Sequence, residues 1–216
     1  MKTLSPPDMS RLVALRQRVQ GVADDVATNR ERFQRLAQRR ENGTAPRAVV
    51  AHQLFQTPEP LAARLVSMLG DLTGKAVLEP SAGCGRLVRE LVKAGADEIT
   101  AVDVSPDCVD VVAPLVTNAV HADFLAQTPA TLGMFDAVAM NPPFTRRSDI
   151  AHIKHALKFL FPGGKLAGLC LATDHRREAL RHLADEWHEL PAGTFRKEGT
   201  EVATCLFLIT SHTTHP

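Results

Sequence analysis

The chain has 216 residues, 44% of them hydrophobic, and its formal net charge is +1. This length suits one ordinary domain with an extension, and the hydrophobic fraction can fill a core, which excludes an intrinsically disordered chain. The longest apolar runs are only as long as a strand, and the first residues lack an apolar run suited to export or insertion. We therefore expect a globular, cytoplasmic protein that does not enter a membrane.

The basic residues are concentrated in an N-terminal extension, residues 1–47. This extension holds ten Lys/Arg and five Asp/Glu, so it carries +5 and the remainder of the chain −4. Residues 8–41 contain no proline, and apolar residues recur there at alternating spacings of three and four, which predicts a helix with one apolar seam. The seam needs a partner, either the same helix of a second subunit in a homodimer or the body of the chain. We favour the body, because Gly21 weakens the helix.

Residues 48–216 are expected to form a second domain of α/β class. Short β-rich runs alternate there with helix-like stretches of the length found in βα units. The predicted strands are residues 75–79, 99–104, 120–123, 135–140, 165–172 and 202–209. The predicted helices are residues 59–69, 86–95, 106–117, 149–161 and 175–186. This pattern predicts an open, mostly parallel sheet with helices on both faces, which binds ligands beyond the carboxyl ends of its strands.

The four cysteines and nine histidines give no metal-site pattern. Cys84, Cys108, Cys170 and Cys205 are scattered, without the close pairs of a structural zinc site or a small disulfide framework. Two further candidates, His152 and His155, share a face of a predicted helix, but no third ligand accompanies them. We expect reduced thiols and no bound metal.

A glycine-rich turn follows the first predicted strand, which ends in Glu79. The turn consists of Pro80, Ser81, Ala82, Gly83, Cys84 and Gly85, and its glycines allow the backbone to approach a ligand closely. Asp103 ends the next strand about twenty residues later, the spacing of a carboxylate that binds ribose hydroxyls. Val88 replaces the last glycine of the dinucleotide pattern, and Glu79 suits a ligand with a positively charged amino group. These features favour S-adenosylmethionine over NAD.

Together with three further segments, in this order along the chain, these motifs resemble the class I amino-methyltransferases. The segments are Phe55-Gln56-Thr57-Pro58, Asp123-Phe124 and Asn141-Pro142-Pro143-Phe144. The resemblance is strongest to gamma-type N6-adenine DNA methyltransferases of phages and mobile elements that lack a separate target-recognition domain. It implies a Rossmann-like sheet of seven strands and an enzyme that depends on S-adenosylmethionine.

The resemblance also implies a cofactor site at the strand ends. The segment 56–58 would close over the methionine part of the cofactor, and Asp123 would accept a hydrogen bond from its adenine amino group. Phe124 would pack against the adenine ring, although a residue at a strand end can equally belong to the core. The full expected set is Gln56, Thr57, Pro58, Glu79, Pro80, Ser81, Ala82, Gly83, Gly85, Asp103, Val104, Asp123, Phe124 and Asn141.

The tetrapeptide 141–144 directly follows a buried-strand pattern and carries the predicted chemistry. An adenine amino nitrogen shares its lone pair with the ring and is a poor nucleophile. The side-chain oxygen of Asn141 and the carbonyl of Pro142 can each accept one amino hydrogen and so localise that lone pair. Pro142 and Pro143 stiffen the loop, and Phe144 would stack on the target ring. We predict direct methyl transfer to adenine N6 in DNA, without a covalent enzyme intermediate.

The target base must leave the DNA stack to reach Asn141. Basic residues that could hold the phosphates beside it are Arg146, Arg147, Arg196 and Lys197, and Phe195 is a second candidate for stacking. The basic extension would add a sequence-independent phosphate surface. Since little of the chain remains for a recognition domain, we expect a relaxed or very short sequence preference.

Three alternatives remain open at this stage. An RNA amino-methyltransferase acting on adenine or guanine could use the same tetrapeptide. A glutamine N5 protein methyltransferase of the release-factor type is ranked lower, because that family has tyrosine where this chain has Phe144. The third alternative is an inactive cofactor-binding partner subunit, and the intact Asp103 and Asn141 argue against it.

Overall fold

The computed structural model describes residues 56–144, 148–196 and 201–212. The predicted helix of residues 8–41 and its homodimer surface lie outside the described residues, as does Phe55. Within the described ranges, no helix combines the length and the apolar character needed to cross a bilayer.

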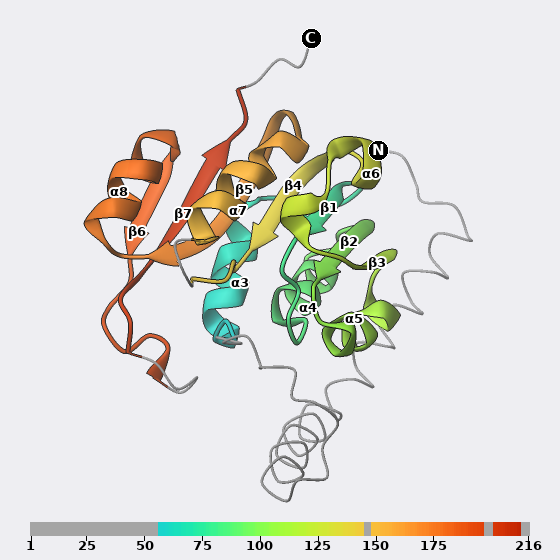
Figure 1. The fold of residues 1–216 in the computed structure, drawn as a ribbon, viewed down its shortest axis with the longest axis horizontal. Helices are drawn as coiled ribbons and strands as arrows, with labels where there is room; N and C mark the ends of the chain where they lie inside the picture. Colours follow the sequence, from blue (N-terminus) through green and yellow to red (C-terminus); the bar gives the residue numbers. More distant parts are fainter. Residues whose placement is uncertain (1–55, 145–147, 197–200, 213–216) are drawn as a thin grey trace, which may run out of the picture. The chain divides into compact units, whose positions relative to one another are not determined.

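Seven strands form one sheet in the order β3-β2-β1-β4-β5-β7-β6 (Figure 1). Strand β7 runs antiparallel to β5 and β6, whereas the pairs from β3 to β5 are parallel. The strands are β1 (Ala76–Glu79), β2 (Glu98–Asp103), β3 (Asn118–His121), β4 (Phe135–Met140), β5 (Leu160–Leu171), β6 (Glu186–Glu189) and β7 (Thr204–Thr210). The predicted fold class, a mostly parallel seven-stranded sheet of the Rossmann-like kind, is confirmed.

Helices cover both faces of this sheet (Figure 1). They are α3 (Glu59–Met68), α4 (Arg86–Lys93), α5 (Pro106–Val112), α6 (Pro129–Leu132), α7 (Ser148–Ala156) and α8 (Asp174–Leu180). Alternate residues of one strand belong to different cores: Val77 packs with α3 and α4, and Leu78 with α7 and α8. This alternation is what a sheet buried on both faces requires, because successive side chains point to opposite sides.

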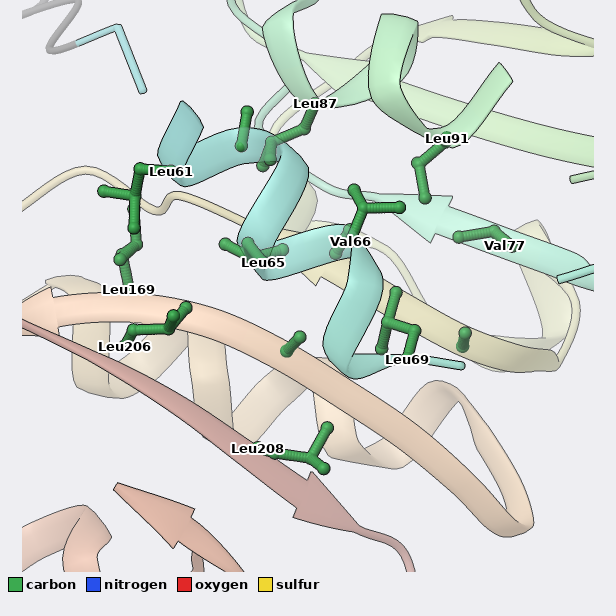
Figure 2. Packing of buried hydrophobic residues seen from close by; sticks show 14 of the residues in the cluster. Leu61, Leu65, Val66, Leu69, Val77, Leu87, Leu91, Leu169, Leu206 and Leu208 are labelled. Carbon is green, nitrogen blue, oxygen red and sulfur yellow. The ribbon is translucent and has the colours of Figure 1, made fainter. Parts of the chain in front are cut away.

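Helix α3 packs against one face of the sheet (Figure 2). Its buried residues Leu61, Leu65 and Val66 recur at helical spacing, so one face of the helix is apolar. This face joins the cluster that contains Leu169 of β5 and Leu206 of β7. The helix begins directly after residues 56–58, so its packing also fixes where that segment lies.

Several predicted elements differ from the structure. The helix predicted for residues 175–186 ends at Leu180 and is followed by a short turn. The predicted helix 149–161 ends earlier, because β5 already begins at Leu160 and continues through residues 162–164, where its pairing with β4 is irregular. The helix predicted for residues 106–117 ends at Val112 and continues only as a short turn that contains Pro114. Strand β6 was not among the predicted strands, since its four residues are mostly polar and pair only with β7.

Candidate active site

Four neighbouring strands end with polar residues at one edge of the sheet. Glu79 ends β1, Asp103 ends β2, Asp123 follows β3 and Asn141 follows β4. Because β3, β2, β1 and β4 are adjacent and parallel, their carboxyl ends lie at the same edge (Figure 1). Ligands of open α/β sheets bind at this edge, so the fold brings these four predicted site residues to one side of the molecule.

Asp103 holds the glycine-rich turn in place. One of its carboxylate oxygens accepts the backbone N–H of Gly83 at 2.8 Å, and the other accepts that of Ser105 at 2.8 Å. Gly83 and Gly85 have φ angles of 50° and 76°, a region that favours glycine. The carboxylate therefore joins the end of β2 to the turn after β1, and its remaining lone pairs suit ribose hydroxyls.

Glu79 is a buried carboxylate with an unused acceptor. Glu79 is 1% exposed, and one of its carboxylate oxygens accepts the N–H of Ser81 at 3.1 Å. Its other oxygen, Oε2, has no hydrogen-bond partner within the described residues. Burial raises the pKa of Glu79 well above its ordinary value, although the hydrogen bond from Ser81 opposes this shift. A buried acceptor of this kind fits the positively charged amino group of S-adenosylmethionine.

The ends of β2 and β3 offer apolar surface for a flat ring. Val104 is 56% exposed and Leu125 is 40% exposed, which is unusual for large hydrophobic residues in this domain. Asp123, between these two positions in sequence, is exposed and accepts the N–H of Leu125 at 2.9 Å. These residues therefore lie at the same edge of the sheet as Asp103, because β2 and β3 are adjacent and parallel.

Phe124 lies in the core. Its ring is 2% exposed and packs against His155 and Phe159, with ring centroids 5.0 Å and 5.2 Å apart. The ring nitrogens of His152 and His155 lie 2.8 Å and 2.9 Å from backbone carbonyls. Across the described residues, no three metal-ligating side chains come together.

Asn141 is tied to two segments that are distant in sequence. Its side-chain Nδ2 donates to the hydroxyl of Thr57 at 3.1 Å. Its backbone carbonyl accepts a hydrogen bond from the hydroxyl of Ser81 at 3.3 Å. The side chain and the backbone of Asn141 are thus held by residues of the two segments that the sequence assigns to the cofactor.

The rest of the tetrapeptide is anchored through its carbonyl groups. Ser148 donates its hydroxyl to the carbonyl of Pro143 at 2.6 Å, and Arg176 donates Nη2 to that of Phe144 at 3.3 Å. Pro142 is buried and Pro143 is exposed. Phe144 is 8% exposed and belongs to the core cluster that contains the buried residues of α3, so its ring packs within the domain.

The segment 56–58 is fastened to the start of α4. The side-chain oxygen of Gln56 accepts a hydrogen bond from Arg86 at 3.0 Å, and its Nε2 donates to the sulfur of Cys84 at 3.4 Å. Arg86 also pairs with Glu59 at 3.3 Å. Sequence reasoning did not single out Arg86, although its place directly after Gly85 was a usable signal.

Two of the five predicted substrate-binding residues, Phe195 and Arg196, belong to the described residues. Arg146, Arg147 and Lys197 lie outside the described residues. Arg196 is exposed and pairs with Glu201 at 2.8 Å, whereas Phe195 is fully buried in the core. Arg196 is thus accessible at the surface, and the ring of Phe195 packs inside the domain.

Several solved methyltransferase structures share this fold at low sequence identity. The M protein of the type I restriction enzyme EcoKI is 18% identical, with a TM-score of 0.59 over 74% of this chain and 44% of that chain. The T. thermophilus 16S rRNA N2 G1207 methyltransferase, solved with AdoMet and guanosine, is 21% identical, with a TM-score of 0.54 over 72% and 43%. An RNA methyltransferase from Salinibacter ruber, solved with S-adenosyl-L-homocysteine, is 16% identical, with a TM-score of 0.53 over 74% and 96%.

No curated protein matches the chain. The model of the methyltransferase small domain family matches residues 60–191, which is more than half of the chain and includes all four polar strand ends. The predicted cofactor, S-adenosylmethionine, is confirmed at the level of the family. The chain belongs to the methyltransferase small domain family and is a methyltransferase that uses S-adenosylmethionine.

Proposed function

We propose that this methyltransferase transfers the methyl group to the exocyclic N6 amino group of adenine in DNA. The observation that carries the proposal is the position of Asn141. It follows the central strand β4, and hydrogen bonds from Ser81 and to Thr57 hold it beside both segments expected to bind the cofactor. This position supports an amide acceptor next to the segments that are expected to bind the methyl donor.

The tetrapeptide supplies the acceptors that an aromatic amino group needs. The side-chain oxygen of Asn141 and the carbonyl of Pro142 would each accept one amino hydrogen, which localises the nitrogen lone pair. The cofactor supplies an electrophilic methyl group on a sulfonium. The anchors on the carbonyls of Pro143 and Phe144 limit loop motion, so the acceptors are oriented before the substrate binds.

Charge and sequence motifs support DNA as the target. The extension 1–47 carries +5, which suits a phosphate backbone. The order of the motifs resembles the gamma-type N6-adenine DNA methyltransferases, and the short chain favours a relaxed or very short recognition sequence. An amino group in RNA is the second candidate, since structures with this fold include an rRNA methyltransferase as well as a restriction-enzyme M protein.

The test is to incubate the full chain with radiolabelled S-adenosylmethionine and equal amounts of DNA, RNA and protein acceptors. Nuclease digestion and mass spectrometry then identify the modified base. We expect N6-methyladenine in DNA. Label found only in RNA would establish the second candidate, and label found only in protein would contradict both.

The variant Asn141→Ala tests the role of the tetrapeptide. Loss of a preorganised acceptor should lower the transfer rate by about 100-fold or more. Cofactor affinity, measured by isothermal titration calorimetry, should stay close to that of the wild type. The matched control is Asn118→Ala, at an exposed position of β3. Loss of both transfer and cofactor binding in Asn141→Ala would show that Asn141 is a structural residue.

A further inference from the structure

Thr57 and Asn141 are 84 residues apart in the chain, yet their side chains form a hydrogen bond. The Nδ2 group of Asn141 donates to the hydroxyl oxygen of Thr57 at 3.1 Å. Thr57 is 3% exposed and Asn141 is half-buried, so the Thr57 end of this contact is shielded from solvent. A hydrogen bond with one buried partner has few competing partners on that side and therefore favours one orientation of the groups it joins.

The orientation of the Asn141 amide decides whether it can serve the reaction. One end of the amide accepts hydrogen bonds and the other end donates them. The amino group that receives the methyl group donates hydrogen bonds, so it must face the oxygen end of the amide. The nitrogen end would place two hydrogen-bond donors against each other. With Nδ2 directed at Thr57, the oxygen lies at the other end of the amide, away from Thr57.

The hydroxyl of Thr57 is not required by the helix that follows it. Helix α3 begins at Glu59 with Pro58 as its N-cap, and it has no side-chain cap hydrogen bond. Threonine just before a helix commonly satisfies free N–H groups, but here it does not. The hydroxyl is thus available to Asn141.

The two segments beside Asn141 are themselves fixed. Gln56 is held by Arg86 and contacts Cys84, which ties the neighbour of Thr57 to the glycine-rich turn. From the same turn, Ser81 donates to the backbone carbonyl of Asn141. Backbone and side chain of Asn141 are therefore held separately, the first by Ser81 and the second by Thr57.

We infer that Thr57 is a positioning residue for methyl transfer: its hydroxyl orients the Asn141 amide so that the oxygen faces the acceptor amino group. This inference rests on the proposed function. It gives Thr57 a role in the chemical step, in addition to the cofactor contact expected for residues 56–58. Loss of the hydroxyl should therefore lower kcat and leave cofactor affinity nearly unchanged.

The experiment compares Thr57→Val, Thr57→Ala and Thr57→Ser in the full chain. Valine keeps the shape of threonine but has a methyl group where threonine has the hydroxyl. Alanine lacks the hydroxyl and adds no methyl group at that position. Serine retains the hydroxyl. We expect Thr57→Val and Thr57→Ala to lower kcat at saturating cofactor and DNA by about 100-fold, the scale of a small misplacement of a catalytic group. Thr57→Ser should recover most of that loss.

The matched control is Thr204→Val. Thr204 is also buried, and its hydroxyl has no hydrogen-bond partner in the described part of the chain. This variant should keep the wild-type kcat. In an Asn141→Ala background, Thr57→Val should add no further loss, because residues that act as a unit are not additive.

Two outcomes would overturn the inference alone. One is that the wild type is active and Thr57→Val has the same kcat as the wild type. The other is weakened cofactor affinity with an unchanged kcat at saturating cofactor, which would make Thr57 a cofactor contact only. A wild type that methylates no nucleic acid would instead overturn the proposed function, and this inference with it.

Discussion

At the residue scale, Glu79 is a carboxylate in surroundings that disfavour its charge. Burial raises its pKa well above the ordinary value, the hydrogen bond from Ser81 lowers it in part, and the nearby charge of Asp103 raises it further. A positively charged amino group placed beside Glu79 would favour the ionised form. Binding of the cofactor should therefore be coupled to release of a proton from Glu79.

The coupling predicts opposite effects of pH on stability and on binding. Because the pKa is raised in the folded, cofactor-free protein, the contribution of Glu79 to stability is full below its unfolded pKa and is lost as pH rises through the folded pKa. The Tm of the cofactor-free protein should fall over that range, and Glu79→Gln should flatten this fall. Cofactor affinity should instead weaken on acidification.

Calorimetric titration of Glu79→Gln tests the binding half of this prediction. A hydrogen bond to a charged group contributes about 1.5–3 kcal/mol, so cofactor affinity should drop by about 10-fold or more. Glu90→Gln, on the neighbouring helix α4, is the control. A wild-type affinity that does not change with pH would contradict the coupling.

The residues at the strand ends could be recognised from sequence, but their contacts could not. Glu79, Asp103 and Asn141 stand at the ends of predicted strands, and parallel strands bring such positions together. The bond between Asn141 and Thr57 depends on the packing of α3, which no local pattern encodes. Phe195 was expected to be a second stacking residue for the target base, whereas Phe195 is fully buried.

At the scale of elements, a buried ion pair joins α7 to α8. Arg176 of α8 donates Nε and Nη2 to the two carboxylate oxygens of Asp149 at 3.0 Å and 3.1 Å. Asp149 is fully buried, and the same Nη2 reaches the carbonyl of Phe144. The pair therefore connects two helices to the end of the tetrapeptide.

Removing one partner of this pair should be costly. Asp149→Ala leaves the guanidinium of Arg176 buried without its carboxylate, which typically destabilises a protein by about 3–5 kcal/mol. Chemical denaturation measures the loss of unfolding free energy when the midpoint and slope of the variant are compared with those of the wild type. Asp174→Ala is the control, because its side chain is fully exposed in its pair with Arg177 and should change little. Equal stability of the two variants would contradict the prediction.

Sequence patterns are sufficient to locate most of the strands. Five of the seven strands were located within about two residues, the usual uncertainty of a boundary. Four of these five are mostly apolar, whereas β3 has polar residues at both ends. Strand β5 begins earlier than predicted, because residues 160–164 resemble a helix end followed by a turn. Strand β6 is short and polar, and only its pairing with β7 makes it a strand.

At the scale of the whole molecule, charge is unevenly distributed along the chain. The extension carries +5 and residues 48–216 carry −4. A polyanion is thus attracted to the extension more than to the remainder of the chain. If the extension supplies phosphate contacts, affinity for DNA should depend on it while the chemical step should not.

This division can be tested by replacing arginines of the extension with glutamine. The positions are Arg30, Arg32, Arg35, Arg39 and Arg40. DNA affinity should fall similarly for all sequences, and the dependence of log affinity on log salt should become shallower by about 0.9 for each lost phosphate contact. The kcat at saturating DNA should be unchanged. An unaltered salt dependence would exclude the extension as a phosphate surface.

The sheet can be divided between the adjacent strands β1 and β4 into two halves that carry different residues at their carboxyl ends. The half formed by β3, β2 and β1 ends in the carboxylates expected around the methyl donor. The half formed by β4, β5, β7 and β6 carries Asn141 and, in the proposed function, the loops that would lie beside the incoming base. Under the proposed function, mutations in the second half should change which base is modified while cofactor affinity stays intact, so base specificity could evolve separately from cofactor binding.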